Sequence, residues 1–243
     1  MKSEVVRLRR YAMPVIDDIR DSQKMLKGKG FKYKFLYFWE YYRIPTLIIG
    51  CVIAIVVSVI VTMVRNKPAQ FQAAFINALA LPESSACAEY LELDESKGPV
   101  VFDGTYVINL DPSSYSDVTY TSSQKLMAAI AGADLDVMIS TGDLIKGYLN
   151  AEIYMDLREV FSDSELDAFG DAVLWGTPTD PETGEILGEN IPYAINIGSY
   201  SGITSVPCYF GDDVYMGVIA NAPHTNLIKK FVKFLSEYTY VVQ

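Results

Sequence analysis

The longest apolar run in the chain is TLIIGCVIAIVVSVIVTMV, residues 46–64. An uncharged run of nineteen residues spans about 28 Å as an α-helix, close to the roughly 30 Å of a bilayer's hydrocarbon core. Twelve of the nineteen are Ile, Val or Leu, the residues that favour membrane insertion most strongly. The alternative is a buried helix or core strand, but a strand this long would be unusual. The run therefore predicts a transmembrane helix at 44–65.

Charge is distributed unevenly on the two sides of this run. Residues 1–43 contain eleven Lys or Arg against five Asp or Glu, whereas residues 68–243 contain seven against twenty-five. Because basic residues favour the cytoplasmic side, we expect a single-pass protein of the cell membrane with a cytoplasmic N-terminus and an extracellular domain at 66–243. Residues 31–43 interleave aromatics with Lys and Arg, which fits an interfacial belt better than a nucleic-acid site. The net charge of -10 also argues against nucleic acid as a partner.

The few His and Cys residues argue against a metal site and leave a disulfide undecided. One His and three Cys leave no plausible zinc cluster, and we expect no metal or other cofactor. Cys87 and Cys208 fall in the exported part, where a disulfide is permitted, but the sequence does not decide whether they pair. Cys51 formally matches a lipidation motif but lies near the start of the apolar run. We therefore expect an uncleaved, unlipidated anchor.

Residues 66–243 alternate between strand-like and helix-like segments, which predicts an α/β domain with parallel strands. The expected strands are 71–79, 104–110, 134–140 and 213–220. Ser122 or Ser123 is expected to cap a helix, and Thr141 and Asp143 to open another. A turn at 179–185 should join two antiparallel strands. Finally, an apolar stripe at helical spacing predicts a helix near the C-terminus.

No catalytic set assembles, and we expect no enzyme. His224 follows a proline at a predicted helix start, where a capping or surface role is the expected one. The segment 198–202 has Tyr200, not Ser, at its centre, so it is no nucleophile elbow. The acid pairs Asp134/Asp136 and Asp212/Asp213 are interpreted as solvated turns.

Four patterns occur in order along the exported part: AFINA at 74–78, QKLMAAIAGADLDV at 124–137, NAEIYMDLREV at 150–160 and YMGVIANAPHTNLIKKFVKFL at 215–235. Together they resemble the extracellular solute-binding proteins of bacterial ABC importers, of the type 2, two-lobed kind. The resemblance implies a three-layer α/β lobe. About 55 residues separate the third pattern from the fourth. That is too few for a full second lobe, so the second half is expected to be reduced.

The resemblance implies a membrane-anchored module that captures a small molecule or short peptide outside the cell, with the permease subunits of an ABC importer or other membrane proteins as partners. Ligands of open α/β sheets bind beyond the carboxyl ends of the strands. The candidate ligand-binding residues are accordingly Asn77, Thr141, Asp143, Asn196 and Tyr200. The alternative role of Thr141 and Asp143 is helix capping. The alternative function is a non-catalytic extracellular scaffold or accessory subunit of a membrane complex, which the reduced second half favours.

Overall fold

The computed structural model of the chain describes residues 30–65, 67–94, 96–111, 113, 116–180 and 182–240. The chain divides into two compact units, Met1–Arg65 and Asn66–Gln243, which are described separately. Of the predicted cytoplasmic segment, residues 1–29 lie outside the described residues.

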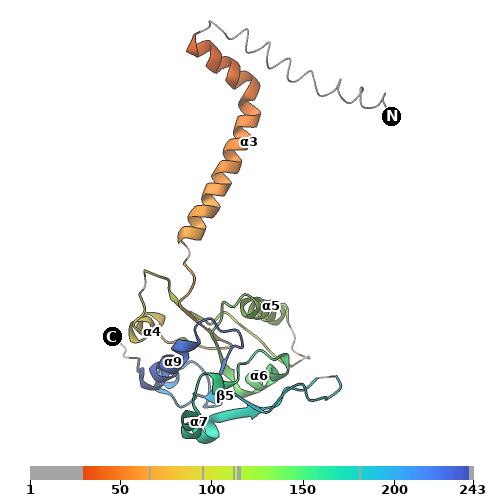
Figure 1. Ribbon diagram of the computed structural model, residues 1–243, viewed down its shortest axis with the longest axis vertical. Helices are drawn as coiled ribbons and strands as arrows, with labels where there is room; N and C mark the ends of the chain where they lie inside the picture. Colours follow the sequence, from red (N-terminus) through yellow and green to blue (C-terminus); the bar gives the residue numbers. More distant parts are fainter. Residues whose placement is uncertain are drawn as a thin grey trace. The chain divides into compact units, whose positions relative to one another are not determined.

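The apolar run lies in a long helix, α3 (Phe31–Arg65), shown in Figure 1. Its stretch Arg43–Thr62 is long and apolar enough to cross a membrane, judged by length and composition alone. Side chains in this stretch are exposed, as Ile55 is at 63%, and none of the stretch is buried inside the protein. The run is therefore neither a strand nor the buried helix of a soluble core.

The second unit contains a six-stranded mixed sheet in the order β2-β1-β3-β6-β5-β4. Its strands are β1 (Phe71–Phe75), β2 (Val100–Asp103), β3 (Val137–Thr141), β4 (Val173–Gly176), β5 (Ile191–Asn196) and β6 (Val214–Val218). β1 is parallel to β2 and β3, whereas β6 is antiparallel to both β3 and β5. Strands β1, β2, β3 and β5 thus point the same way. We call the edge of the sheet where they end the carboxyl edge, and the opposite one the amino edge.

Helices cover both faces of this sheet (Figure 1). They are α4 (Ser84–Tyr90), α5 (Asp117–Ala131), α6 (Gly142–Gly147), α7 (Asp163–Phe169), α8 (Ser201–Thr204) and α9 (Thr225–Glu237), with 3-10 turns η2 (Leu149–Ala151), η3 (Leu157–Glu159) and η4 (Gly170–Ala172). Alternate residues of β1 point to opposite faces. Phe71 meets Phe231 of α9 on one face, with ring centroids 4.7 Å apart, and Ala74 joins Leu126 of α5 on the other. The predicted α/β class is confirmed, with helices on both faces of the sheet, but the expected parallel pairing holds only among β1, β2 and β3, because β6 runs antiparallel between β3 and β5.

The second predicted strand is displaced in the structure. The strand lies at Val100–Asp103, and residues 104–110 have no regular structure. Tyr106 and Ile108 are nevertheless buried, because they pack between the sheet and α5. Their apolar alternation is that of a core-facing segment, which propensity alone cannot distinguish from a strand.

The helix predicted to begin at Ser122 or Ser123 begins earlier, at Asp117. Ser116 is its N-cap, and the Ser116 hydroxyl oxygen accepts a hydrogen bond from the Thr119 amide at 3.2 Å. Ser122 instead lies inside α5, where its hydroxyl accepts a hydrogen bond from the Val107 amide at 3.1 Å. The Ser122 prediction was wrong because a serine with a distant backbone partner carries the same local signal as a cap.

The other elements lie close to their predicted positions. β1, β3 and β6 fall within the strands expected near 71–79, 134–140 and 213–220, with β3 extending one residue further. The turn at 179–185 joins β4 and β5, which pair antiparallel, and an isolated bridge links Thr179 to Ile186. The predicted C-terminal helix is α9, whose core-facing residues include Phe231, Phe234 and Leu235.

Candidate functional site

The five residues predicted to bind ligand lie at or next to the carboxyl edge. Asn77 follows β1, Thr141 ends β3 and Asn196 ends β5. Asp143 lies in the first turn of α6, and Tyr200 is the N-cap residue of α8. Thr141 is paired with Val214 and Asn196 with Tyr215, so these two side chains flank the first residues of β6. The fold therefore gathers on one edge residues that are up to 123 positions apart in the chain.

The amide of Asn77 is occupied by the protein's own backbone. Its Oδ1 accepts a hydrogen bond from the Ile108 amide at 2.9 Å, and its Nδ2 donates to the Ile108 carbonyl at 2.7 Å. Asn77 also has a positive φ of 59°, a conformation that Asn tolerates better than most residues. Asn77 thus fastens the irregular segment after β2 to the end of β1.

Asn196 is used in a similar way. Its Oδ1 accepts a hydrogen bond from the Gly198 amide at 2.9 Å, and its Nδ2 donates to the Asp212 carbonyl at 3.2 Å. Gly198 lies so close to Asp212 that a Cβ at position 198 would overlap the Asp212 carbonyl. Asn196 therefore shapes the two loops beside it. Tyr200 is half-buried, and burial raises the pKa of its hydroxyl.

Thr141 and Asp143 differ from the two asparagines. Thr141 is the N-cap residue of α6 but makes no side-chain capping hydrogen bond, so the capping alternative is not realised by its hydroxyl. Asp143 is exposed. Among the residues that the structure describes, neither side chain has a hydrogen-bond or ion-pair partner. These two polar groups are consequently free to meet a ligand.

Asp213 lies next to Thr141 and Asp143, although the sequence indicated only that it belongs to a solvated turn. Its carboxylate lies over Gly142, where a Cβ would be 2.8 Å and 2.9 Å from the two carboxylate oxygens. The Gly142 amide also donates to the Asp213 carbonyl at 3.1 Å. Glycine at 142 thus permits the close approach that places Asp213 beside Thr141 and Asp143. No local pattern predicts this contact, because it joins segments 71 residues apart.

A cavity of about 470 Å³ opens at the carboxyl ends of β1 and β2. It is lined by Ala78–Leu81 and Val101–Thr105 and includes none of the five predicted residues. Its volume falls within the roughly 300–1,000 Å³ of ligand pockets, and most of its lining is apolar. No sequence pattern predicted this cavity, because the residues that line it form no chemical motif.

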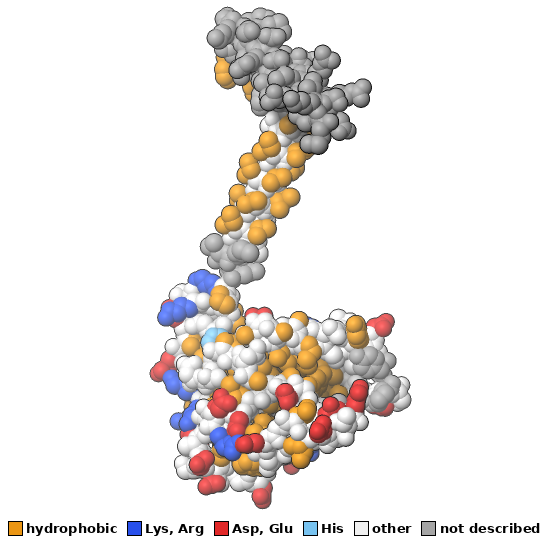
Figure 2. All heavy atoms as spheres, turned by 45° about the vertical axis from the view of Figure 1, so that its right-hand side comes forward, with side chains coloured by type: hydrophobic (Ala, Val, Ile, Leu, Met, Phe, Trp, Pro, Cys, Tyr) orange, Lys and Arg blue, Asp and Glu red, His pale blue; other side chains and the backbone are white. Residues whose placement is uncertain are grey.

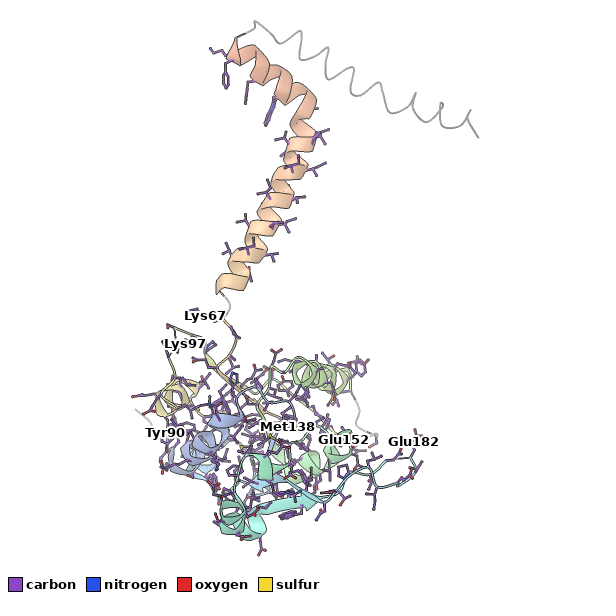
Figure 3. All side chains as sticks on the ribbon, viewed as in Figure 1. Lys67, Tyr90, Lys97, Met138, Glu152 and Glu182 are labelled. Atoms are coloured by element: carbon purple, nitrogen blue, oxygen red, sulfur yellow. The ribbon has the colours of Figure 1, made fainter. Side chains whose placement is uncertain are left out.

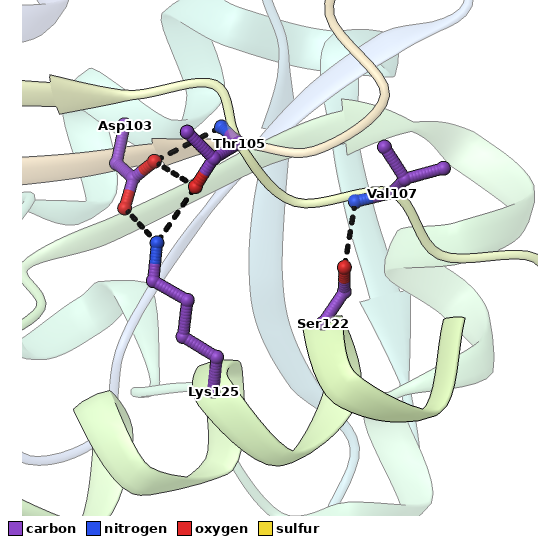
Figure 4. A network of polar contacts seen from close by, with 5 residues as sticks. All are labelled: Asp103, Thr105, Val107, Ser122 and Lys125. Atoms are coloured by element: carbon purple, nitrogen blue, oxygen red, sulfur yellow. Dashed lines mark hydrogen bonds and ion pairs between the residues drawn. The ribbon is translucent and has the colours of Figure 1, made fainter. Parts of the chain in front are cut away.

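An ion pair borders this cavity (Figure 4). Lys125 of α5 donates to Asp103 Oδ2 and to the Thr105 hydroxyl, both at 2.7 Å. Burial opposes ionisation of Asp103, but the hydrogen bonds from Lys125 and Thr105 outweigh it and lower the pKa of the carboxyl. Asp103 is therefore ionised, and Lys125 compensates its charge. The pair adds little electrostatic potential to the cavity.

The amino edge holds a carboxylate of another kind. The Asp136 side chain is 1% exposed, so its interpretation as a solvated turn residue was wrong. It accepts hydrogen bonds from the amides of Gln72 and His224, both at 2.8 Å, and its Oδ2 lies 3.1 Å from His224 Nδ1. His224 is the N-cap residue of α9 but makes no side-chain capping hydrogen bond, and its contacts with Asp136 join the start of this helix to the starts of β1 and β3.

Within the described ranges, no group of three or more His, Cys, Asp or Glu side chains is arranged to hold a metal ion. Cys87 and Cys208 are both buried and free, and burial raises the pKa of each thiol to about 12. Comparison with protein families, with curated proteins and with solved structures gave no match to this chain.

Proposed function

We propose that this chain is a single-pass membrane protein whose α/β domain lies outside the cell and captures a small molecule or short peptide. In this proposal the domain acts as a reduced, anchored form of the solute-binding proteins that serve ABC importers. The observation that carries the proposal is that the same edge of the sheet holds two features: unpartnered polar groups on Thr141, Asp143 and Asp213, and a ligand-sized cavity at the ends of β1 and β2.

The charges at the carboxyl edge favour a neutral or cationic ligand. Asp143, Asp212 and Asp213 are all exposed there, and the nearby Lys125 is engaged by Asp103. Exposed charges are screened beyond about 8 Å at physiological salt, so direct contacts with these carboxylates should decide affinity more than the overall field does. An ammonium group or a hydroxyl-rich neutral molecule is the chemistry that this edge would accept.

A thermal-shift screen of the full-length protein in detergent tests the binding function. Amino acids, short peptides and sugars are the probes, and a ligand at 100 times its Kd should raise the free energy of unfolding by about 2.7 kcal/mol. Asp143→Ala and Asp213→Asn should each weaken the ligand's Kd several-fold without lowering stability. Asp134→Ala removes an exposed acid at the amino edge and serves as the matched control. Unchanged affinity in both carboxyl-edge variants would refute the site.

Protease added to intact cells tests the proposed orientation. α3 supports it by its exposed apolar surface, and the excess of Lys and Arg before α3 supports a cytoplasmic N-terminus. We expect digestion of residues 66–243 and protection of an N-terminal tag until the cells are permeabilised. Protection of the domain in intact cells would contradict the proposal.

A second candidate function is that of an extracellular scaffold or accessory subunit without a small ligand. It is favoured by two exposed apolar side chains at the carboxyl edge, Leu79 at 57% and Phe210 at 87%. The Leu79 amide donates to the Cys208 carbonyl at 2.8 Å, so both side chains belong to neighbouring loops. Exposed apolar groups of this kind suit a protein partner. Phe210→Ser should then release a partner from the complex while leaving every small-molecule thermal shift unchanged.

A further inference from the structure

A second pocket lies at the amino edge, away from the candidate ligand site. It has a volume of about 210 Å³ and lies between η2 and the hairpin that joins β4 to β5. Its apolar lining comes from Leu149, Tyr154, Pro178 and Ile191. The volume is below the roughly 300 Å³ at which pockets begin to hold whole small-molecule ligands, but it can accept one long side chain. We call this the hairpin pocket.

The floor of the hairpin pocket is held in place by the core. The rings of Tyr154 and Tyr193 pack with centroids 5.6 Å apart, and Tyr154 lies against the backbone of β6 at Gly217. A Cβ at position 217 would lie 2.5 Å from Tyr154 Cε1, so glycine is required there. The Tyr154 hydroxyl points inward, 3.7 Å from Met138 Sδ. The pocket is therefore preformed and presents the apolar side of Tyr154 to an incoming group.

Two carboxylates border the hairpin pocket, those of Glu152 and Glu189. Both side chains are exposed, and in the part of the chain that the structure describes neither has a hydrogen-bond or ion-pair partner. The guanidinium of Arg158 is held by Asp156, with Nη2 and Oδ2 2.5 Å apart, and this hydrogen bond raises the pKa of Arg158 more than the nearby Glu189 does. The pocket thus combines an apolar interior with two exposed carboxylates at its rim.

The apolar surface continues from the pocket onto the hairpin. Ile186 and Leu187 are 70% and 50% exposed, and the Leu187 amide donates to the carbonyl of the pocket residue Pro178 at 2.9 Å. Figure 2, which turns the hairpin side of the domain forward, shows apolar side chains gathered on this face with Asp and Glu around them. Figure 3 shows Glu182 far out on the hairpin, whereas Glu152 lies nearer the core. The exposed side chains of Ile186 and Leu187 thus extend the apolar surface beyond the pocket.

We propose that the hairpin pocket binds a Lys or Arg side chain from an apolar segment of a partner protein. The aliphatic part of such a side chain would fill the pocket while its charged head meets Glu152 and Glu189, and apolar neighbours would cover Ile186 and Leu187. The sequence supports a positively charged partner group, since residues 159–228 contain eleven Asp or Glu and no Lys or Arg. A second copy of the domain would bring two such acidic surfaces together, and like charges disfavour that contact. Anionic lipid headgroups are disfavoured for the same reason.

Peptide binding to the full-length protein in lipid nanodiscs tests the proposal. The probe is acetyl-Leu-Val-Lys-Leu-Val-amide with a fluorescent label, and its Lys→Gln analogue supplies the same apolar body without the charge. Empty nanodiscs measure partition into lipid. Glu152→Gln combined with Glu189→Gln should weaken binding of the Lys probe about tenfold or more. Glu182→Gln combined with Glu185→Gln changes the net charge of the domain equally and should alter Kd less than twofold.

A blocking variant makes the test independent of charge. Gly188 lines the hairpin pocket, and a Cβ there would lie 3.8 Å from Pro178, an ordinary contact, so Gly188→Leu is the variant chosen to place a side chain in the pocket. We expect this variant to keep the wild-type melting temperature and to lose binding of the Lys probe. The proposal is overturned if the Lys and Gln probes bind equally, if the distal Glu pair matters as much as the rim pair, or if Gly188→Leu binds normally. None of these outcomes depends on a ligand at the carboxyl edge.

Discussion

Asp136 and Asp143 lie just before and just after the same strand, β3, yet their surroundings are opposite. Asp136 is buried at the amino edge, where the amides of Gln72 and His224 donate to it. Asp143 is exposed at the carboxyl edge and has no partner among the described residues. The difference arises because the segment between β6 and α9 passes Asp136 and supplies the His224 amide, whereas none of the described residues donates a hydrogen bond to the Asp143 side chain. Asp136 therefore stabilises the fold, and Asp143 is available for binding.

The largest effect is expected from Asp136→Ala. The substitution leaves two partly buried amides and the His224 ring without their acceptor, which should lower the free energy of unfolding by about 3 kcal/mol. Urea unfolding of the detergent-solubilised protein, followed by circular dichroism, measures the change. Asp143→Ala is the matched control and should change stability by less than about 0.5 kcal/mol. Equal losses of stability in the two variants would show that the surroundings of Asp136 and Asp143 do not differ in the way described.

Asn77 sharpens the comparison, because it lies at the carboxyl edge, like Asp143, but its side chain is hydrogen-bonded to the backbone, like that of Asp136. Asn77→Ala removes both hydrogen bonds to Ile108 and forces alanine into a positive φ, so it should cost about 2 kcal/mol of stability. Asn77→Gly also loses the bonds but tolerates the backbone, and should lie between alanine and wild type. Thermal unfolding ranks the three proteins. An alanine variant of normal stability that no longer binds ligand would instead assign Asn77 to the binding site.

Glu165 provides a pH-dependent contact on the α9 face. Hydrogen bonds from Lys229 and from Ser162 lower the pKa of Glu165 to about 2. A carboxyl whose folded pKa is lowered stabilises the protein above its unfolded pKa, and the effect disappears as pH falls through the folded value. We expect this contribution to be lost between about pH 4.5 and pH 2. Glu165→Gln should flatten that part of the stability curve, and Asp163→Asn, beside it in α7, is the control. Parallel curves for wild type and Glu165→Gln would contradict the assignment.

The smallest effect concerns the two buried thiols. Cys87 and Cys208 lie in the core beneath α9, and burial raises the pKa of each to about 12. Thiolate is the reactive form, so iodoacetamide at pH 8 should label neither residue in the folded protein. Mass spectrometry after unfolding in urea should find both labelled. Labelling of the native protein would show that this face of the sheet opens more readily than its packing indicates.

The sequence predicted the α/β class of the domain because apolar periodicity reports which residues face the core. The long run in α3, the strands β1, β3 and β6 and the stripe of α9 were all found in this way. The error at 104–110 has a physical cause, since Tyr106 and Ile108 face the core without joining the sheet. A single sequence records that a residue is buried, but not whether its backbone pairs with a strand or with a side chain such as Asn77.

The sequence predicted that the candidate residues lie along one edge of the sheet, but not which of their polar groups are free. The rule that ligands bind beyond the carboxyl ends of parallel strands brought Thr141, Asp143 and Asn196 to one edge. Whether a polar group there is free depends on contacts between distant segments. Asn196 is engaged by Gly198 and Asp212, whereas the carboxylate of Asp213 reaches Thr141's neighbourhood only because residue 142 is glycine. These contacts leave no mark in local sequence patterns.

The position of β4 at the end of the sheet has a consequence for the behaviour of the purified protein. An outermost strand offers its backbone to any other strand that approaches, and β4 also carries the half-exposed ring of Trp175. The acidic residues around it keep molecules apart by mutual repulsion, which dissolved ions weaken. Concentrated solutions should therefore scatter more light as sodium chloride is added, and a lysine in place of Trp175 should suppress that turbidity.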